Sequence, residues 1–165
     1  MPLPSERWTP AVDAFVDQAR LFCAFVERSS GLSLRERLLE ARQRLLGLYT
    51  AGSVLPVVEP PEGIDASWDR QRAPGWRGFE TLEAYWEVFD PYEEDAPVCT
   101  VLSDDVLDIY FDVQRGLDLW DRDVPCTAAI WEWRFHFDTH WGDHAIDALR
   151  ALHRACGQVT AARSW

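Results

Sequence analysis

Three histidines lie at four-residue intervals near the end of the chain, at His136, His140 and His144. Histidines spaced by four fall on adjacent turns of one helix face, where two imidazoles can bind the same metal ion. Histidine beside a carboxylate also transfers protons near neutral pH. The acids around the three are Glu132, Asp138, Asp143 and Asp147. The pattern therefore indicates a metal site, a proton-handling site or the solvated side of an aromatic helix.

The positions of these side chains around a helix separate them into two groups. At about 100° per residue, His136 and His140 share one polar stripe about 80° wide. The acids of that stripe are Glu132, Asp143 and Asp147. His144 falls about 40° beyond the stripe, at the edge of the apolar side. Apolar residues cover more than half of the circumference, which is typical of a central helix in a bundle.

A second polar stripe marks the helix predicted just before, from a cap at Ser103 to about residue 120. Its acids are Asp104, Asp105, Asp108 and Asp112. Where the two stripes converge, Asp108 and Asp112 face the two histidines of the first stripe. Such a mixed oxygen and nitrogen set suits Mn²⁺ or Fe. The candidate metal site comprises Asp108, Asp112, His136, His140, Asp143 and Asp147.

The alternative is that each stripe faces water separately. The chain has neither an H-E-x-x-H motif nor an E-x-x-H pair. The helix dipole favours acids in a first turn, which is enough to explain Asp104 and Asp105. The sequence thus predicts no cofactor, with a divalent metal as the open alternative.

The acidic excess of the chain is concentrated in residues 80–123. The formal net charge is −12, and this segment has fourteen acids against Arg115 and Arg122. A field of that sign repels a phosphate backbone, which argues against nucleic-acid binding. It favours a basic, arginine-rich protein partner or simply a solubilising surface.

Aromatic and acidic residues occur together most densely in residues 79–92. Aromatic rings beside carboxylates form a good surface for arginine, through cation–π contact and charge attraction. The segment also suits a core helix with an acidic outer edge. The candidate interaction patch comprises Tyr85, Trp86, Glu87, Asp90, Tyr92, Glu93, Glu94 and Asp95.

Helical spacing of apolar residues dominates the chain, and strand-like alternation is absent. Proline after Thr9 and a capping box at Ser33 and Glu36 mark the first two helix starts. Helices are predicted at about residues 10–31, 33–52, 81–89, 103–120 and 125–157. The sequence therefore predicts an all-α bundle of about five helices in a single domain, residues 1–165. Its second and third helices are joined by a long loop rich in proline and glycine, residues 53–78, which is a crossover and not a domain boundary.

Composition restricts the remaining possibilities. A chain of 165 residues with 47% hydrophobic residues is long enough to bury a core. The four cysteines lack the spacing of a zinc finger or a disulfide framework, so reduced thiols are expected. The apolar runs are too short to cross a bilayer and the first residues do not resemble a secretory signal, which predicts a cytoplasmic protein without a membrane partner. The oligomeric state stays open.

Four segments of the chain, residues 79–92, 102–110, 131–135 and 139–145, share a pattern of aromatic and acidic residues. Together they resemble a family of small bacterial helical proteins that is classified only as a domain of unknown function. The resemblance extends over about residues 79–152. It implies an all-helical cytoplasmic protein, and it implies no activity and no catalytic residue.

Two functions follow from these patterns. The first is a non-enzymatic interaction module that binds a basic partner through residues 80–123. The second is a metal-dependent hydrolase or a metal-binding bundle that uses His136 and His140 with Asp108 and Asp112. The lack of a recognised ligand motif on facing helices favours the first.

Overall fold

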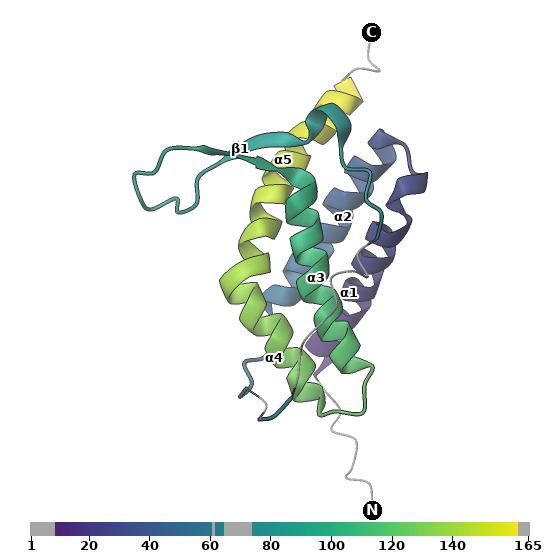
Figure 1. Ribbon diagram of the computed structural model, residues 1–165, viewed down its shortest axis with the longest axis vertical. Coiled ribbons are helices and arrows are strands. Elements are labelled where there is room, and N and C mark those ends of the chain that lie inside the picture. Colours follow the sequence, from purple (N-terminus) through teal and green to yellow (C-terminus); the bar gives the residue numbers. More distant parts are fainter. Residues whose placement is uncertain (1–8, 61, 65–73, 162–165) are drawn as a thin grey trace, which may run out of the picture.

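The computed structural model describes residues 9–60, 62–64 and 74–161. Within these residues the chain forms long helices and one small sheet (Figure 1). The helices are α1 (Pro10–Arg28), α2 (Leu34–Ser53), α3 (Leu102–Trp120), α4 (Cys126–His136) and α5 (Gly142–Ala161). One turn of π-helix, η4 (Phe137–Trp141), joins α4 to α5, so that these two helices form one continuous rod. The predicted, mostly helical fold is confirmed. None of the described helices is long and apolar enough to span a membrane.

The helices pack around a shared core. Helix α1 contacts α2 and α3, α5 contacts the same two helices, and α4 contacts α3. Trp133 is fully buried at the centre, where its ring centroid lies 4.9 Å from that of Phe15 on α1. The indole N–H of Trp133 donates to the carbonyl oxygen of Val113 at 3.0 Å. A Cβ at Gly116 would lie 2.0 Å from the indole nitrogen of Trp133, so glycine permits α4 to approach α3 this closely.

The first two helices begin as the sequence predicts. Helix α1 starts at Pro10, with Thr9 as its N-cap residue. Helix α2 starts after Ser33, whose hydroxyl accepts from the backbone N–H of Glu36 at 3.3 Å. A carboxylate oxygen of Glu36 accepts from the backbone N–H of Ser33 at 2.9 Å, which completes the capping box. The 3₁₀ turn η1 (Ser29–Gly31) connects the two helices.

The prediction of a helix at residues 81–89 is wrong, and so is the expectation that the chain has no strands. A 3₁₀ turn, η3 (Glu80–Leu82), leads into strand β1 (Ala84–Glu87), which pairs antiparallel with β2 (Val98–Val101). The hairpin projects sideways from the bundle near the start of α3 (Figure 1). Helical spacing misleads here because Tyr85 and Trp86 favour strand conformation. The fold is therefore a helical bundle with a two-stranded sheet rather than an all-α bundle.

Helix α3 begins directly after β2, and the predicted N-cap at Ser103 is wrong. Val101 precedes the helix with an extended backbone and provides no side-chain cap. The backbone N–H of Leu102 instead donates to the carbonyl oxygen of Glu83 at 2.8 Å. One free donor at the helix start is thus satisfied by the hairpin, which ties the hairpin to α3.

The long connection predicted at residues 53–78 lies partly outside the described residues. Its described parts contain no helix or strand after α2 ends at Ser53. Trp76 packs edge-on against Phe25 and Phe79, with ring centroids 6.0 and 5.4 Å away. These contacts hold the last part of the connection against the bundle.

Candidate functional site

The polar stripes of α3 and of the α4–α5 rod face one another. Nδ1 of His140 lies 2.6 Å from Oδ2 of Asp112, and Nδ1 of His136 lies 3.7 Å from the same oxygen. An ionised carboxylate only accepts hydrogen bonds, so Nδ1 of His140 carries a proton. Of the two arrangements that the sequence leaves open, the structure has the convergent one.

The π-helical turn η4 adds a third histidine to the stripe. Such a turn inserts one residue into an α-helix, so every later residue is set back by about 100° around the axis. His144 consequently turns toward α3, where its Nδ1 lies 2.8 Å from Oδ1 of Asp105. The same rotation takes Asp143 and Asp147 out of the predicted stripe. The straight-helix prediction misplaces these three side chains for that reason. His136, His140 and His144 are called the histidine array.

A glycine makes this π-turn possible. A Cβ at Gly142 would lie 2.2 Å from the carbonyl oxygen of Phe137, five residues earlier. Any larger residue has to move the backbone of the turn, so Gly142 is the residue on which the alignment of the array depends.

Three carboxylates beside the array are buried. The exposed fraction is 2% for Asp105, 5% for Asp112 and 8% for Glu132. Buried carboxylates are stable only when they are paired with cations or hydrogen-bond donors. The first two meet histidines of the array, whereas Oε2 of Glu132 lies 3.3 Å from Nε2 of His136 without a hydrogen bond between them.

Arg115 fills the space at one end of the array. Its Nη2 donates to Oδ1 of Asp112 at 2.6 Å and lies 2.9 Å from Nε2 of His136. A guanidinium group has no acceptor, so Nε2 of His136 accepts this bond. Nε of Arg115 also lies 3.2 Å from Oε2 of Glu132, although this ion pair lacks the alignment of a hydrogen bond. Arg115 thus hydrogen-bonds Asp112 and His136 and forms an ion pair with Glu132.

Asp108 lies at the solvent side of the array. Its Oδ2 is 3.9 Å from Nε2 of His144. Asp108, His140 and His144 each offer one ligand atom within 4.8 Å of the other two, and so do Asp112, His136 and His140. The structure therefore brings together the four central residues of the predicted metal site and adds His144. Asp143 and Asp147 do not join them.

The hairpin is connected to the array through Tyr85. Its hydroxyl donates to Oδ2 of Asp105 at 2.6 Å and lies 2.9 Å from Oε2 of Glu87. Burial, together with these two carboxylates, raises the pKa of Tyr85, so the hydroxyl keeps its proton.

The hydrogen bond to Asp105 raises the pKa of His144, and the negative charge of Asp108 adds to this increase.

Side chains alternate across the hairpin. Tyr85 and Glu87 are partly buried, whereas Ala84 and Trp86 between them point outward. Trp86 is 67% exposed. Two residues of the predicted interaction patch, Tyr85 and Glu87, therefore face the bundle and not the outer surface.

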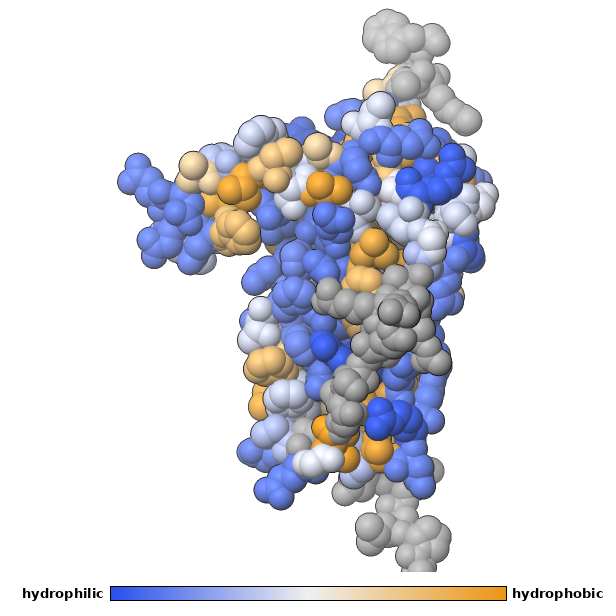
Figure 2. Space-filling model, viewed as in Figure 1, coloured by the Kyte–Doolittle hydropathy of each residue, from blue (hydrophilic) through white to orange (hydrophobic). Residues whose placement is uncertain are grey.

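The loop between the two strands presents aromatic rings to solvent. Phe89 is 80% exposed and Tyr92 is 95% exposed. Oδ1 of Asp90 accepts from the backbone N–H of Tyr92 at 2.8 Å, which fixes the turn between them. Residues 84–101 contain five acids and no arginine, and Figure 2 shows apolar and hydrophilic side chains next to each other on the hairpin. Rings this exposed are not part of the hydrophobic core.

A groove of about 580 Å³ lies between the hairpin loop and α5, and it is called the acidic groove. Its apolar residues are Val88, Phe89, Pro91 and Ile146, and its charged residues are Glu93, Asp95, Asp143, Asp147 and Arg150. Burial, followed by the negative charges of Glu87 and Asp105, raises the pKa of Asp147 to about 6. A cation in the groove relieves this repulsion, so the groove is complementary to positive charge.

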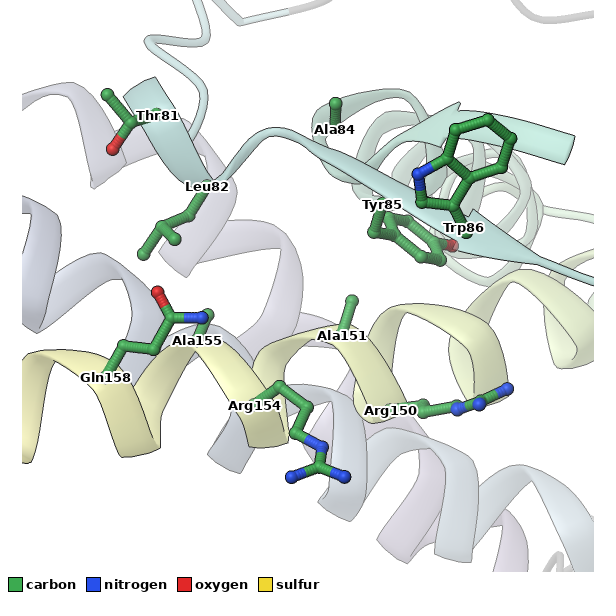
Figure 3. A pocket seen from close by; sticks show the side chains of 10 residues that line it. All are labelled: Thr81, Leu82, Ala84, Tyr85, Trp86, Arg150, Ala151, Arg154, Ala155 and Gln158. Atoms are coloured by element: carbon green, nitrogen blue, oxygen red, sulfur yellow. The ribbon is translucent and has the colours of Figure 1, made fainter.

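A smaller cleft, of about 270 Å³, lies between β1 and α5 (Figure 3). Leu82 and Tyr85 line it from the hairpin side, and Ala151 lines it from α5. Figure 3 shows the guanidinium group of Arg154 directed away from the strand and the side chain of Arg150 extended along α5. The cleft is smaller than pockets that bind organic ligands, which begin at about 300 Å³, and no ligand is assigned to it.

The rest of the predicted interaction patch lies on the hairpin surface. Its exposed members are Trp86, Asp90, Tyr92, Glu93, Glu94 and Asp95. Sequence reasoning missed Phe89 and Ile146 as parts of this surface, and it assigned Asp143 and Asp147 to a metal site. The groove between the loop and α5 was not predictable, because the segment that forms the hairpin is predicted as a helix.

A family described as a domain of unknown function (DUF5063) matches residues 6–157 of the chain. The chain belongs to this family. The match includes residues 79–152, so the resemblance stated from the sequence is confirmed. The family description names no activity, and the function of this DUF5063 chain has to be argued from its own side chains.

The fold of this DUF5063 chain is similar to that of a protein whose structure has been solved. A crystal structure of protein BF1032 from Bacteroides fragilis aligns with a TM-score of 0.72 at 21% sequence identity, and the alignment covers 88% of this chain and 92% of that chain. At this identity the similarity concerns the fold alone. A comparison with curated proteins gave no match.

Proposed function

We propose that this DUF5063 chain is a non-enzymatic interaction module whose acidic groove binds an arginine- or lysine-rich segment of a partner protein. The composition of the groove carries the proposal. Among its lining residues, four carboxylates stand against the single Arg150, around an apolar floor that includes Phe89 and Ile146.

Arginine and lysine side chains each have an apolar stem and a positively charged head group, and both match such a groove. Their apolar stems pack on Phe89 and Ile146, while their charged heads reach the carboxylates of Glu93 and Asp95. The exposed ring of Phe89 adds a face for cation–π contact. The pKa of Asp147 is raised first by burial and then by the negative charges of Glu87, Asp105 and Asp143, so a cation beside this carboxylate is favourable.

The hairpin holds one wall of the groove in place before any partner binds. Asp90 orders the loop, and Tyr85 anchors β1 to α3. Order of this kind reduces the entropic cost of binding. The exposed rings of Trp86 and Tyr92 extend the contact surface beyond the groove, and the net charge of −12 attracts a basic partner from a distance.

The second function, a metal-dependent hydrolase at Asp108, Asp112, His136 and His140, has weaker support. Arg115 hydrogen-bonds both Asp112 and His136. The four side chains therefore do not surround a common position for a cation.

The proposal is tested by fluorescence anisotropy with a short labelled peptide in which arginine alternates with leucine. A triple variant removes three groove charges: Glu93→Gln, Asp95→Asn and Asp143→Asn. We expect its dissociation constant for the peptide to rise by about tenfold or more at low salt, because close charge pairs across an interface are lost. The same peptide with neutral citrulline in place of arginine is expected to bind poorly to the unchanged protein.

A matched control separates the groove from overall charge. Asp17→Asn, Glu59→Gln and Asp123→Asn change the net charge by the same amount at exposed positions away from the hairpin. We expect this variant to bind the peptide within about twofold of the unchanged protein. Equal weakening by both triple variants would show that the peptide senses only net charge, and the proposal would be wrong.

A further inference from the structure

The histidine array contains two groups of three side chains that are close enough to bind one metal ion. One consists of Asp112, His136 and His140, and the other of Asp108, His140 and His144. His140 belongs to both, so at most one of the groups can use it fully. The surroundings of each group decide between them.

The first group is already occupied by a positive charge. Nη2 of Arg115 lies 2.6 Å from Oδ1 of Asp112 and 2.9 Å from Nε2 of His136. A guanidinium group does not lose its proton in a protein, so it repels any cation at this position. Nε2 of His136, which accepts from the guanidinium, is not free to bind a metal.

The second group has the arrangement typical of metal-binding histidines. Nδ1 of His140 lies 2.6 Å from Asp112, and Nδ1 of His144 lies 2.8 Å from Asp105. Both aspartates are at least nine-tenths buried. A carboxylate that accepts the Nδ1 proton fixes the tautomer and the ring orientation, and leaves the Nε2 lone pair for a metal. Each imidazole in this group thus has its own supporting carboxylate.

The ligand atoms of the second group are close to metal-binding geometry. Nε2 of His144 lies 3.9 Å from Oδ2 of Asp108, and each of the three residues has one nitrogen or oxygen ligand atom within 4.8 Å of a ligand atom of the other two. Ligands at about 2.1 Å from a tetrahedral ion are about 3.4 Å apart. The side chain of Asp108 is 33% exposed, so it has room to make this adjustment.

We propose that His140, His144 and Asp108 bind one divalent transition-metal ion, with Asp112 and Asp105 as supporting carboxylates. Two imidazoles and one carboxylate are a set that zinc and its neighbours prefer over Mg²⁺ or Ca²⁺. The side chains of His140 and His144 are 40% and 31% exposed, so water reaches the ion and occupies its remaining positions. The metal site shares no residue with the acidic groove. A negative result for metal binding therefore leaves the interaction proposal unaffected, and a negative result for peptide binding leaves the metal site unaffected.

The site is tested on untagged, chelator-treated protein by titration with Zn²⁺ and with Co²⁺, whose visible absorption reports coordination by nitrogen and oxygen. We expect about one equivalent of either ion to bind, and the melting temperature to rise with Zn²⁺. Asp108→Asn is expected to weaken Zn²⁺ binding by more than about a hundredfold, and Asp105→Asn by about 10–100-fold, as for a supporting residue. His136→Gln, from the competing group, and His153→Gln, an exposed histidine on the same rod, are expected to bind Zn²⁺ like the unchanged protein.

Three results would overturn the site. The first is no Zn²⁺ binding by the unchanged protein, and the second is unchanged Zn²⁺ binding by Asp108→Asn. The third is loss of binding in His136→Gln with retention in Asp108→Asn, which would place the ion in the competing group. An NMR measurement on the unchanged protein does not depend on whether the variants fold. Zn²⁺ is expected to shift the ¹⁵N resonances of Nε2 in His140 and His144 and to leave the resonance of Nε2 in His136 in place. A shift at His136 without shifts at the other two histidines would contradict the site.

Discussion

The hydroxyl of Tyr85 in β1 donates to Oδ2 of Asp105 in α3 at 2.6 Å, across the junction of hairpin and bundle. The other oxygen of Asp105 lies 2.8 Å from Nδ1 of His144. One buried carboxylate therefore joins the hairpin to the histidine array. An isolated two-stranded hairpin is marginally stable in water, so this junction determines how the wall of the acidic groove is held.

Removing the hydroxyl of this tyrosine tests the junction. Tyr85→Phe is expected to lower the free energy of unfolding by about 1–2 kcal/mol, because buried Asp105 loses a donor. Amide hydrogen exchange in residues 84–101 is expected to become faster than in the rest of the protein. Tyr92→Phe, at a ring that is 95% exposed, is the control and is expected to change neither quantity. Unchanged exchange in Tyr85→Phe would mean that the hairpin is held by other contacts.

The π-turn predicts unequal effects at two glycines of α5. Gly142→Ala is expected to lower the free energy of unfolding by about 1–3 kcal/mol, because the new methyl group meets the carbonyl oxygen of Phe137. Gly157→Ala meets nothing within 4 Å and is expected to stabilise the helix by up to about 1 kcal/mol. Urea denaturation of both variants measures the difference. Equal effects at the two positions would argue against the π-turn.

The raised pKa of Asp147 predicts a change of stability with pH. The carboxyl group of Asp147 holds its proton up to about pH 6 in the folded protein and up to about pH 4 in the unfolded chain. Ionisation therefore costs stability as the pH rises through that window. Asp147→Asn is expected to raise the melting temperature relative to the unchanged protein near pH 8, and this advantage is expected to vanish near pH 4. The effect is at most about 1 kcal/mol, because water still reaches the carboxylate. An advantage that is larger at low pH would contradict the assignment.

The exposed rings of the hairpin are expected to matter for binding and not for stability. Phe89→Ser combined with Tyr92→Ser is expected to change the free energy of unfolding by less than about 0.5 kcal/mol. Phe79→Ala, at a fully buried ring near the base of the hairpin, is expected to cost about 3–5 kcal/mol. Chemical denaturation distinguishes the two. A large loss of stability in the double variant would show that these rings have a structural role.

Local signals in the sequence predict the starts of the first two helices, whereas the sequence leaves open whether the two polar stripes converge or face water separately. Proline after Thr9 and the capping box at Ser33 act within a few residues, so they can be recognised without tertiary structure. In the structure the two stripes converge, and Asp112 lies beside His136 and His140.

Two features were not predictable from local patterns. In the hairpin segment the strand preference of Tyr85 and Trp86 competes with helical spacing, and the contact from Tyr85 to Asp105 on α3 that supports the strand exists only in the folded protein. The π-turn depends on one glycine, Gly142, and glycine has many other roles in helices. That turn moves His144 into the array and Asp147 into the groove, so one inserted residue accounts for the misassigned side chains.

Photo-crosslinking in cells that produce the protein tests the interaction account most directly. A photoreactive side chain replaces Tyr92 in one variant and Val57, an exposed residue away from the hairpin, in another. The account predicts that position 92 crosslinks to an arginine- or lysine-rich segment of a protein, and that neutralising Glu93 and Asp95 abolishes this product. Crosslinks of equal yield from both positions, or crosslinked segments without excess positive charge, would contradict it.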